Sequence, residues 1–231
     1  MLKIQDLTLH YGSSQILNGV SLEAETGKVT CVMGTNGVGK TSLLKAISGT
    51  HPRSGGRMEL NGEEIGRLPA HALARKGIGY VPQGRDIFPL LSVRENLETG
   101  FACLPKSEHY IPDEVFELFP ILKDFLHRRG GDLSGGQQQQ LAIARAMITK
   151  PKLLLLDEPT EGIQPNIIQQ IGRVIEYLRD QGTMAIVLVE QYFEFAYGLA
   201  DQFVVMRRGA VLKQGTKAEL TKAELVEAVS V

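Results

Sequence analysis

The chain has 231 residues, enough for one large domain or for a domain with an inserted lobe. Its hydrophobic (43%) and charged (22%) fractions are ordinary for a globular protein, and a net charge of −1 excludes an overall basic field that would attract nucleic acid. Met1 to Asp6 carry charge too early for a secretory signal, and no apolar run approaches the roughly 18 residues of a membrane helix. We therefore expect a soluble protein whose role at a membrane goes through a partner.

Hydrophobic periodicity predicts an alternation of strands and helices, which is the pattern of an α/β fold. The predicted strands cover residues 2–9, 20–22, 29–33, 56–60, 78–81, 153–156, 184–189, 203–206 and 210–213. Asn61-Gly62, after one of these strands, predicts a hairpin turn. The predicted helices outside the middle of the chain run from Lys40 to Gly49 and over 69–76, 166–179, 193–199 and the tail from Thr216.

The stretch from residue 84 to residue 150 has helical spacing and little strand signal, so we interpret it as a helical lobe inserted into the α/β domain. Ser92 with Glu95 three residues later forms the capping-box pattern of a helix start. A second amphipathic stretch covers residues 112–119, and a third begins at Ser134. Because no linker or low-complexity segment separates two domains, residues 1–231 are predicted to form one domain.

The sequence from Gly34 to Thr41 reads G-x-x-x-x-G-K-T and stands between a predicted strand and a predicted helix. That setting is typical of a P-loop, in which backbone N–H groups surround phosphates, Lys40 reaches the β- and γ-phosphates and the Thr41 hydroxyl holds Mg²⁺. The alternative is a glycine-rich turn that binds nothing. The predicted nucleotide-binding residues here are Gly34, Thr35, Asn36, Gly37, Val38, Gly39, Lys40, Thr41 and Ser42.

The apolar run from Leu153 to Leu156 ends in Asp157 and Glu158. In a P-loop protein, an acidic residue at the end of a buried strand completes the nucleotide site. Asp157 would then coordinate Mg²⁺, and Glu158 would polarise the attacking water. The alternative is an ordinary solvated strand end.

A third motif, Leu133 to Gln137, begins a predicted helix in which Ser134 is the cap and Gly135 and Gly136 expose the first N–H groups. Such a helix start attracts anions. Because the P-loop already surrounds the phosphates of this chain, the motif makes sense if Ser134, Gly135, Gly136 and Gln137 contact the nucleotide of another subunit. Taken alone, the pentapeptide could also be only a helix start.

With these motifs in this order, the chain resembles the ATP-binding cassette (ABC) ATPases over essentially its whole length. Gly34–Thr41 matches the Walker A motif, Leu153–Asp157 the Walker B motif, and Leu133–Gln137 the signature motif. The resemblance implies a RecA-like P-loop NTPase core with an antiparallel β subdomain and the inserted helical lobe. It also implies that Gln83 is a Mg²⁺ ligand and that Tyr11 stacks on adenine, although Tyr11 could instead be an exposed turn residue.

Two positions depart from the pattern of that family. Gln164 stands where many members have aspartate, and Gln191 stands where the family usually has histidine. Gln191 can donate a hydrogen bond to the γ-phosphate but cannot become a cation. The predicted catalytic residues are therefore Lys40, Glu158 and Gln191. The alternative is that Gln191 only caps the helix that follows it.

Glu161-Gly162-Ile163 and Val189-Glu190-Gln191 resemble the second ATPase of branched-chain amino-acid and amide importers, and Gly136–Leu141 with Gln164–Gln169 resembles the ATP-binding subunit of the urea importer. The resemblance implies an ATPase that uses ATP and Mg²⁺ to drive solute uptake, of urea first and of branched-chain amino acids or short amides as the alternative. Its expected partners are a second, different ATPase subunit, with a homodimer as the alternative in isolation, and membrane permeases. The permeases would dock near Gln83 and the helical lobe on the cytoplasmic face of the inner membrane, and no nucleic acid is expected. The alternative of another class is a soluble ABC ATPase of an assembly or repair machine.

Overall fold

A six-stranded sheet forms the centre of the computed structural model, which describes residues 1–230. Its strand order is β10-β9-β3-β8-β7-β6, and all neighbouring strands are parallel except β10, which runs antiparallel to β9. The strands are β3 (Val29–Met33), β6 (Ile78–Val81), β7 (Leu153–Asp157), β8 (Ala185–Val189), β9 (Gln202–Arg207) and β10 (Ala210–Thr216). Every residue of β3, β7 and β8 is buried, because both faces of a parallel sheet are covered.

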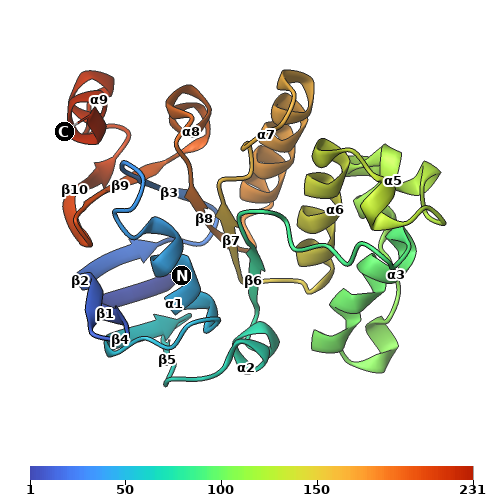
Figure 1. The fold of residues 1–231 in the computed structure, drawn as a ribbon, viewed down its shortest axis with the longest axis horizontal. Helices are drawn as coiled ribbons and strands as arrows, with labels where there is room; N and C mark the ends of the chain where they lie inside the picture. The colour runs from blue at the N-terminus through green and yellow to red at the C-terminus, as the bar shows by residue number, and fades with distance from the viewer. Residues whose placement is uncertain (231) are drawn as a thin grey trace.

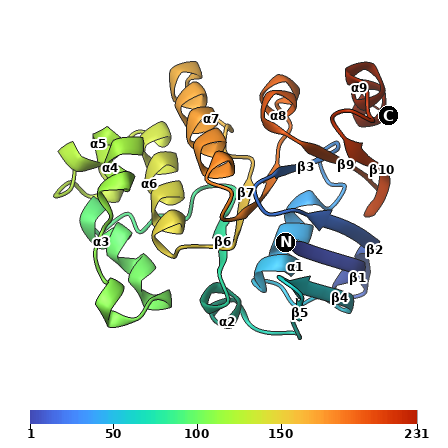
Figure 2. The ribbon, with the colours of Figure 1, turned by 180° about the vertical axis from the view of Figure 1, so that it is seen from behind.

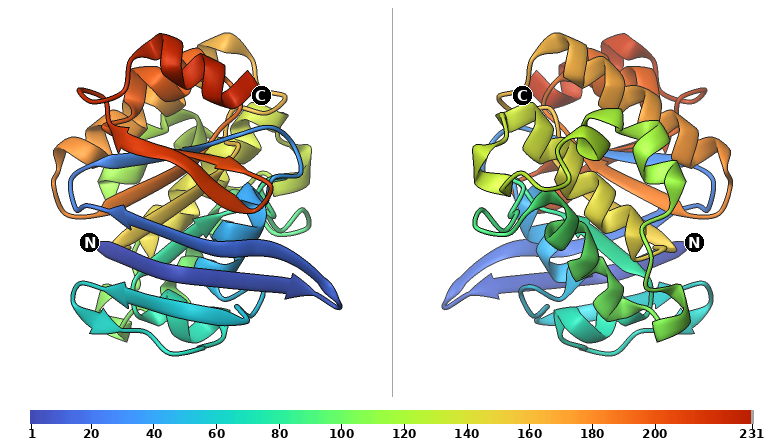
Figure 3. Two further views of the ribbon diagram at one scale, coloured as in Figure 1. Left: turned by 90° about the vertical axis from the view of Figure 1, so that its left-hand side faces the viewer. Right: turned by 90° about the vertical axis from the view of Figure 1, so that its right-hand side faces the viewer.

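A smaller antiparallel sheet with the order β2-β1-β4-β5 lies beside the first. Its strands are β1 (Leu2–Tyr11), β2 (Ser14–Ala24), β4 (Gly55–Leu60) and β5 (Glu63–Glu64). Asn61 and Gly62 connect β4 to β5 with positive φ angles of 52° and 81°, so the predicted hairpin is confirmed. The side views in Figure 3 show this sheet at one end of the molecule and the C-terminal helices at the other.

The central sheet separates two hydrophobic cores, because successive side chains of a strand point to opposite faces. Leu154 and Leu156 belong to the core under the helices α6 (Gly135–Ile148), α7 (Pro165–Asp180) and α8 (Phe193–Leu199). Leu153 and Leu155 belong to the core formed with the antiparallel sheet and α1 (Lys40–Ser48), which lies between the two sheets in Figure 1. Every leucine of this strand is therefore used for packing, which explains its continuous apolar run.

The chain between β6 and β7 is helical, as predicted, and gathers on one side of the molecule (Figure 2). Besides α6 it holds α3 (Val93–Glu98), α4 (Asp113–Leu118), α5 (Pro120–Asp124) and 3₁₀ turns at Thr99–Cys103, Lys106–Glu108 and Gly130–Asp132. Ser92 begins α3 with the predicted capping box, in which its hydroxyl accepts from the Glu95 N–H and the Glu95 carboxylate accepts from the Ser92 N–H. A further short helix, α2 (Ala70–Arg75), precedes β6.

The tail differs from the sequence prediction, because the helix expected from Thr216 onward begins only at Lys222 and forms α9 (Lys222–Ser230). Thr216 instead pairs with Gln202 as the last residue of β10. The Glu219 carboxylate then accepts hydrogen bonds from the Thr216 N–H and hydroxyl, which closes a turn rather than a helix. Among residues 1–230, no helix is both long and apolar enough to cross a membrane.

Candidate nucleotide-binding site

The residues predicted to bind phosphate, hold Mg²⁺ and activate water gather around the carboxyl ends of β3, β8 and β7, which are neighbours in the sheet. This edge of an open α/β sheet is where ligands bind, because loops from several strands converge there. A cavity of about 430 Å³ opens at this edge. It is lined by Tyr11, Ile16, Asn36, Gly37, Gly39, Lys40, Thr41, Ser42, Gln83, Glu158, Glu161 and Gln191. Residues from widely separated stretches of the chain therefore share one cavity.

The loop between β3 and α1 has a backbone that only glycine allows. Gly34 and Gly39 have φ angles of 149° and 106°, and a Cβ atom on Gly34 would lie 2.5 Å from the carbonyl oxygen of Met206. Gly39 is also the N-cap of α1, and among the described residues no side chain caps this helix. The first N–H groups of α1 are therefore left for a ligand, and an anion is the ligand that they attract.

Lys40 opens α1 and is only 5% exposed. Its ammonium group donates to the carbonyl oxygens of Gly34 and Thr35, at 2.9 and 3.1 Å, and burial lowers its pKa. A carboxylate oxygen of Glu158 lies 3.9 Å away. In this arrangement the ammonium group donates to the backbone of the loop that precedes it. When a phosphate binds, phosphate oxygens would replace these carbonyl oxygens as acceptors.

Asp157 ends β7 and is almost fully buried. One of its carboxylate oxygens accepts from the Thr41 hydroxyl at 3.2 Å and the other from the Tyr80 hydroxyl at 3.3 Å. Burial raises the pKa of Asp157, although both hydrogen bonds oppose this rise. Ionising Asp157 therefore costs more in the folded chain than in the unfolded chain, so this group makes the nucleotide-free protein less stable as the pH rises past the ordinary aspartate pKa.

This carboxylate and the neighbouring Thr41 hydroxyl are oxygen ligands of the kind that Mg²⁺ prefers. A cation at this point would also offset the cost of ionising a buried carboxylate. The residues therefore fit Mg²⁺.

Glu158 follows β7 with a φ of +47°, in the left-handed region that a non-glycine residue seldom adopts. One carboxylate oxygen accepts from the side-chain amide of Gln191 at 2.6 Å, and the other accepts from the amide of Gln83 at 3.1 Å. Gln191 therefore points at Glu158. The N-cap of α8 is Tyr192, so the helix-capping role considered for Gln191 is not observed.

The family resemblance predicts that Gln83 is a Mg²⁺ ligand. In the structure its amide nitrogen donates to the carboxylates of Glu158 and Glu161, at 3.1 and 3.0 Å. The structure therefore places Gln83 against the two glutamates of the cavity, and the hydrogen bonds to Asp157 come from other residues.

Ser134 begins α6 and completes a capping box with Gln137. Its hydroxyl accepts from the Gln137 N–H at 3.4 Å, and its own N–H donates to the Gln137 side chain at 2.9 Å. In the described part of the chain, none of the four residues from Ser134 to Gln137 lines the cavity. The helix start is thus separate from the nucleotide site of its own chain, which is the geometry that binding in trans requires. Gln164, the N-cap of α7, is exposed and does not line the cavity either.

Comparison with known proteins decides the family. Residues 17–161 match the family described as ABC transporter. The chain belongs to the ABC transporter family. It is 42% identical over 221 residues to the high-affinity branched-chain amino acid transport ATP-binding protein BraG of Pseudomonas aeruginosa, covering 95% of this chain and 94% of that protein. It is also 33% identical to the high-affinity branched-chain amino acid transport ATP-binding protein BraF of Pseudomonas aeruginosa, and the match covers 95% of this chain and 93% of that protein.

The solved structures agree on the fold. A nucleotide-free ATP-binding cassette from an ABC transporter superposes with a TM-score of 0.86 at 23% identity, covering 100% of this chain and 95% of that chain. The predicted ABC ATPase fold is therefore confirmed. As an ATP-binding cassette of this family, the chain binds ATP or ADP and hydrolyses ATP.

In this cassette, Tyr11 is one of the residues that line the nucleotide cavity. Its side chain is 40% exposed, and its ring centroid is 4.2 Å from that of His51. Tyr11 is therefore partly exposed, as stacking on a base requires.

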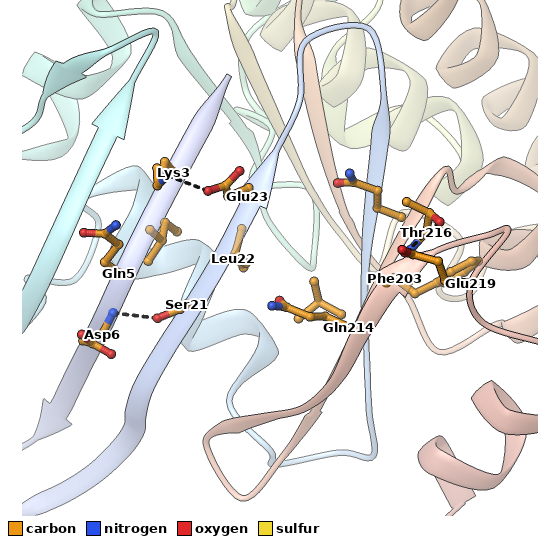
Figure 4. Close-up of a pocket in the computed structure, with 14 residues that line it drawn as sticks. Lys3, Gln5, Asp6, Ser21, Leu22, Glu23, Phe203, Gln214, Thr216 and Glu219 are labelled. Atoms are coloured by element: carbon orange, nitrogen blue, oxygen red, sulfur yellow. Dashed lines mark hydrogen bonds and ion pairs between the residues drawn. The ribbon is translucent and has the colours of Figure 1, made fainter.

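Cavity size alone does not locate the nucleotide site. A larger groove, of about 730 Å³, lies between β1 and β2 on one side and β9 and β10 on the other (Figure 4). An ion pair of 2.8 Å joins Lys3 to Glu23 in its wall, and Gln5, Gln202 and Gln214 line it. None of the predicted site residues of the described chain lies in this groove, so the chemistry of the lining identifies the site.

Three residues of the site were missing from the sequence prediction. Tyr80 donates to Asp157, Glu161 lines the cavity and accepts from Gln83, and Glu190 is buried behind Gln191. Burial raises the pKa of Tyr80, which therefore stays a hydrogen-bond donor. Each of these residues stands close to a motif in the sequence. Their roles were missed because they depend on hydrogen bonds that only the folded structure shows.

Proposed function

We propose that this chain is the ATP-hydrolysing subunit of a solute importer and that its cavity holds Mg²⁺·ATP. The contact between Glu158 and Gln191 carries the proposal, because it joins the residue that would accept a proton from water to an amide that can orient the same water. Lys40 and the free N–H groups of α1 bind the phosphates. Thr41, Asp157 and Gln83 would hold Mg²⁺, which would neutralise phosphate charge.

Two subunits would face each other, with the helix start at Ser134–Gln137 of each contacting the nucleotide of the other. The separation of this helix start from the cavity of its own chain supports the arrangement. We propose that the partner is a different ATPase, since two ATP-binding proteins of one description in Pseudomonas aeruginosa both match this chain. Gln164 and Gln191, which depart from the family pattern, also fit a dimer of two unequal ATPase subunits. Co-purification of this chain as the sole ATPase with its membrane partners would refute the heteromer.

The solute that the relatives support is a branched-chain amino acid, because both relatives carry that description in their names. The comparisons do not support the expectation of urea, which rests on the resemblance of Gly136–Leu141 and Gln164–Gln169 alone. This subunit would sit peripherally on the cytoplasmic face of the inner membrane, with permeases docked near Gln83.

Solute uptake in cells that lack this gene tests the transport function. Leucine uptake should be lost, and the wild-type gene should restore it while the Glu158→Gln gene should not. Loss of urea uptake with normal leucine uptake would instead assign urea. If neither uptake changes, and soluble scaffolds or nucleic acid co-purify in place of membrane proteins, the chain serves an assembly or repair machine.

Purified protein tests the chemistry. Glu158→Gln should bind ATP normally and lose about 10²- to 10⁴-fold in turnover, the usual contribution of a positioned general base. Glu176→Gln, an exposed change on α7, is the matched control and should leave turnover unchanged. Normal hydrolysis by the Glu158→Gln protein would remove Glu158 from the role of base.

A further inference from the structure

Glu190 lies behind the nucleotide cavity as a buried carboxylate that bridges two loops. It is 2% exposed and does not line the cavity. One carboxylate oxygen accepts from the N–H and the hydroxyl of Thr160, at 3.0 and 2.7 Å. The other accepts from the N–H groups of Gln191 and Tyr192, at 3.0 and 3.1 Å. A single side chain thus satisfies four donors.

The two loops joined in this way carry the residues of the proposed hydrolysis step. Thr160 belongs to the loop that follows Glu158, and Gln191 is the side chain that donates to Glu158 at 2.6 Å. The N–H of Glu158 also donates to the carbonyl of Val189, at the end of β8. The hydrogen bonds of Glu190 therefore connect the backbone on both sides of the Glu158–Gln191 contact.

We propose that Glu190 is a positioning residue for ATP hydrolysis, which holds the loop after β7 and the loop after β8 in one register so that the Gln191 amide meets Glu158. The inference rests on the proposed function, in which Glu158 activates water and Gln191 assists it. Glu190 acts through Gln191 and touches no nucleotide.

The chemistry of the bridge requires a carboxylate. Each of its two oxygens accepts hydrogen bonds, and the four donors include three backbone N–H groups that cannot reverse their role. A glutamine of the same shape would turn its NH₂ group toward the N–H groups of one loop and release that loop. Burial raises the pKa of Glu190 and the four donors oppose this rise, so the hydrogen bonds favour the acceptor form.

A double-mutant cycle tests the proposal with Glu190→Gln, Gln191→Ala and the double variant, measured by single-turnover ATP hydrolysis and by ATP binding. Glu190→Gln should lower the rate about 10- to 100-fold, because small misplacements of positioning groups cost that much. The Kd for ATP should stay within about twofold. In the Gln191→Ala background, Glu190→Gln should cause no further loss beyond about twofold, because residues that act through one another are not additive.

Equal losses in both backgrounds would overturn the inference, since they would show that Glu190 acts independently of Gln191. A weakened Kd for ATP with an unchanged rate would also overturn it. Full activity of the Gln191→Ala protein would instead refute the proposed role of Gln191 itself, so the two failures are distinguishable.

Thr160 provides a second variant in case Glu190→Gln does not fold. Thr160→Val keeps the shape of the side chain and removes only the 2.7 Å hydrogen bond to Glu190. It should lower the rate severalfold in the wild-type background and not in the Gln191→Ala background, while Thr160→Ser, which retains a hydroxyl, should restore the rate. Equal turnover by the Thr160→Val and wild-type proteins would argue against the bridge.

Discussion

Two helices of this protein begin with N–H groups suited to an anion, but the two helix starts differ in their capping. The N-terminus of α1, at Gly39, has no side-chain cap among the described residues and opens into the nucleotide cavity. The N-terminus of α6, at Ser134, is capped by its own side chain and by Gln137, and lies outside that cavity. The first end leaves its N–H donors for a ligand of the same chain, whereas at the second end the Ser134 hydroxyl occupies the N–H of Gln137. A capped end can stay exposed until a partner's nucleotide reaches it.

The largest expected effect comes from the uncapped end. Lys40→Ala should abolish ATP binding, because removing one partner of a buried charge pair costs about 3 kcal/mol or more, at least roughly 100-fold in Kd. Equilibrium binding of a fluorescent ATP analogue measures this loss. Lys45→Ala, in the last turn of the same helix, is the control and should bind normally. Unchanged affinity in the Lys40→Ala protein would contradict the assignment of the phosphate site.

A substitution at the capped end of α6 should impair dimer closure and not ATP binding. Ser134→Arg should leave ATP binding to the monomer intact but block ATP-driven dimer closure, because the helix end acts on the nucleotide of the other subunit. Light scattering in a Glu158→Gln background, in which ATP is not consumed, measures closure. ATP-dependent dimers that form as readily with Ser134→Arg would show that this helix end has no role in trans.

A smaller effect is expected at Gln191, which lines the same cavity as the uncapped end of α1 and donates to Glu158. Gln191→Ala should lose about 10²-fold in turnover, the usual cost of one positioned donor. Gln191→His should keep activity and gain a pH step near the histidine pKa of about 6.5, with turnover falling as the pH rises and the imidazolium loses its proton. Gln191 has no proton to lose in this range, so the wild-type profile should lack that step. Full activity of the Gln191→Ala protein would remove Gln191 from the site.

The smallest expected effect is the loss of a helix cap, and comparing two caps distinguishes their contribution to stability from a role in dimer closure. Ser134→Ala and Ser92→Ala each remove the cap of a capping box and should each cost about 1 kcal/mol of stability by chemical denaturation. Only Ser134→Ala should also weaken ATP-driven closure, because the helix that Ser92 caps, α3, carries no part of the predicted site. Equal effects of the two changes on closure would show that the cap of α6 has a structural role alone.

Local patterns predicted most of the fold correctly, since caps, turns and buried strands depend on near neighbours in the chain. The capping box at Ser92, the helix cap at Ser134 and the turn at Asn61-Gly62 are examples. The tail shows the limit of this reasoning. Ala218-Glu219-Leu220 and Ala223-Glu224-Leu225 have the same residues, yet the first lies in a turn and the second in α9. Pairing of Thr216 with Gln202 extends β10 and so delays the helix.

The sequence by itself determined the phosphate-binding loop, the acidic end of β7 and the family, because each depends on residue types at short spacing. Only the tertiary structure decided which side chains meet. Gln191 turns toward Glu158, Tyr80 donates to Asp157, and Glu190 joins two loops that are 30 residues apart. These contacts arise because parallel strands bring distant segments to one edge of the sheet, and a buried carboxylate takes whichever donors that edge provides.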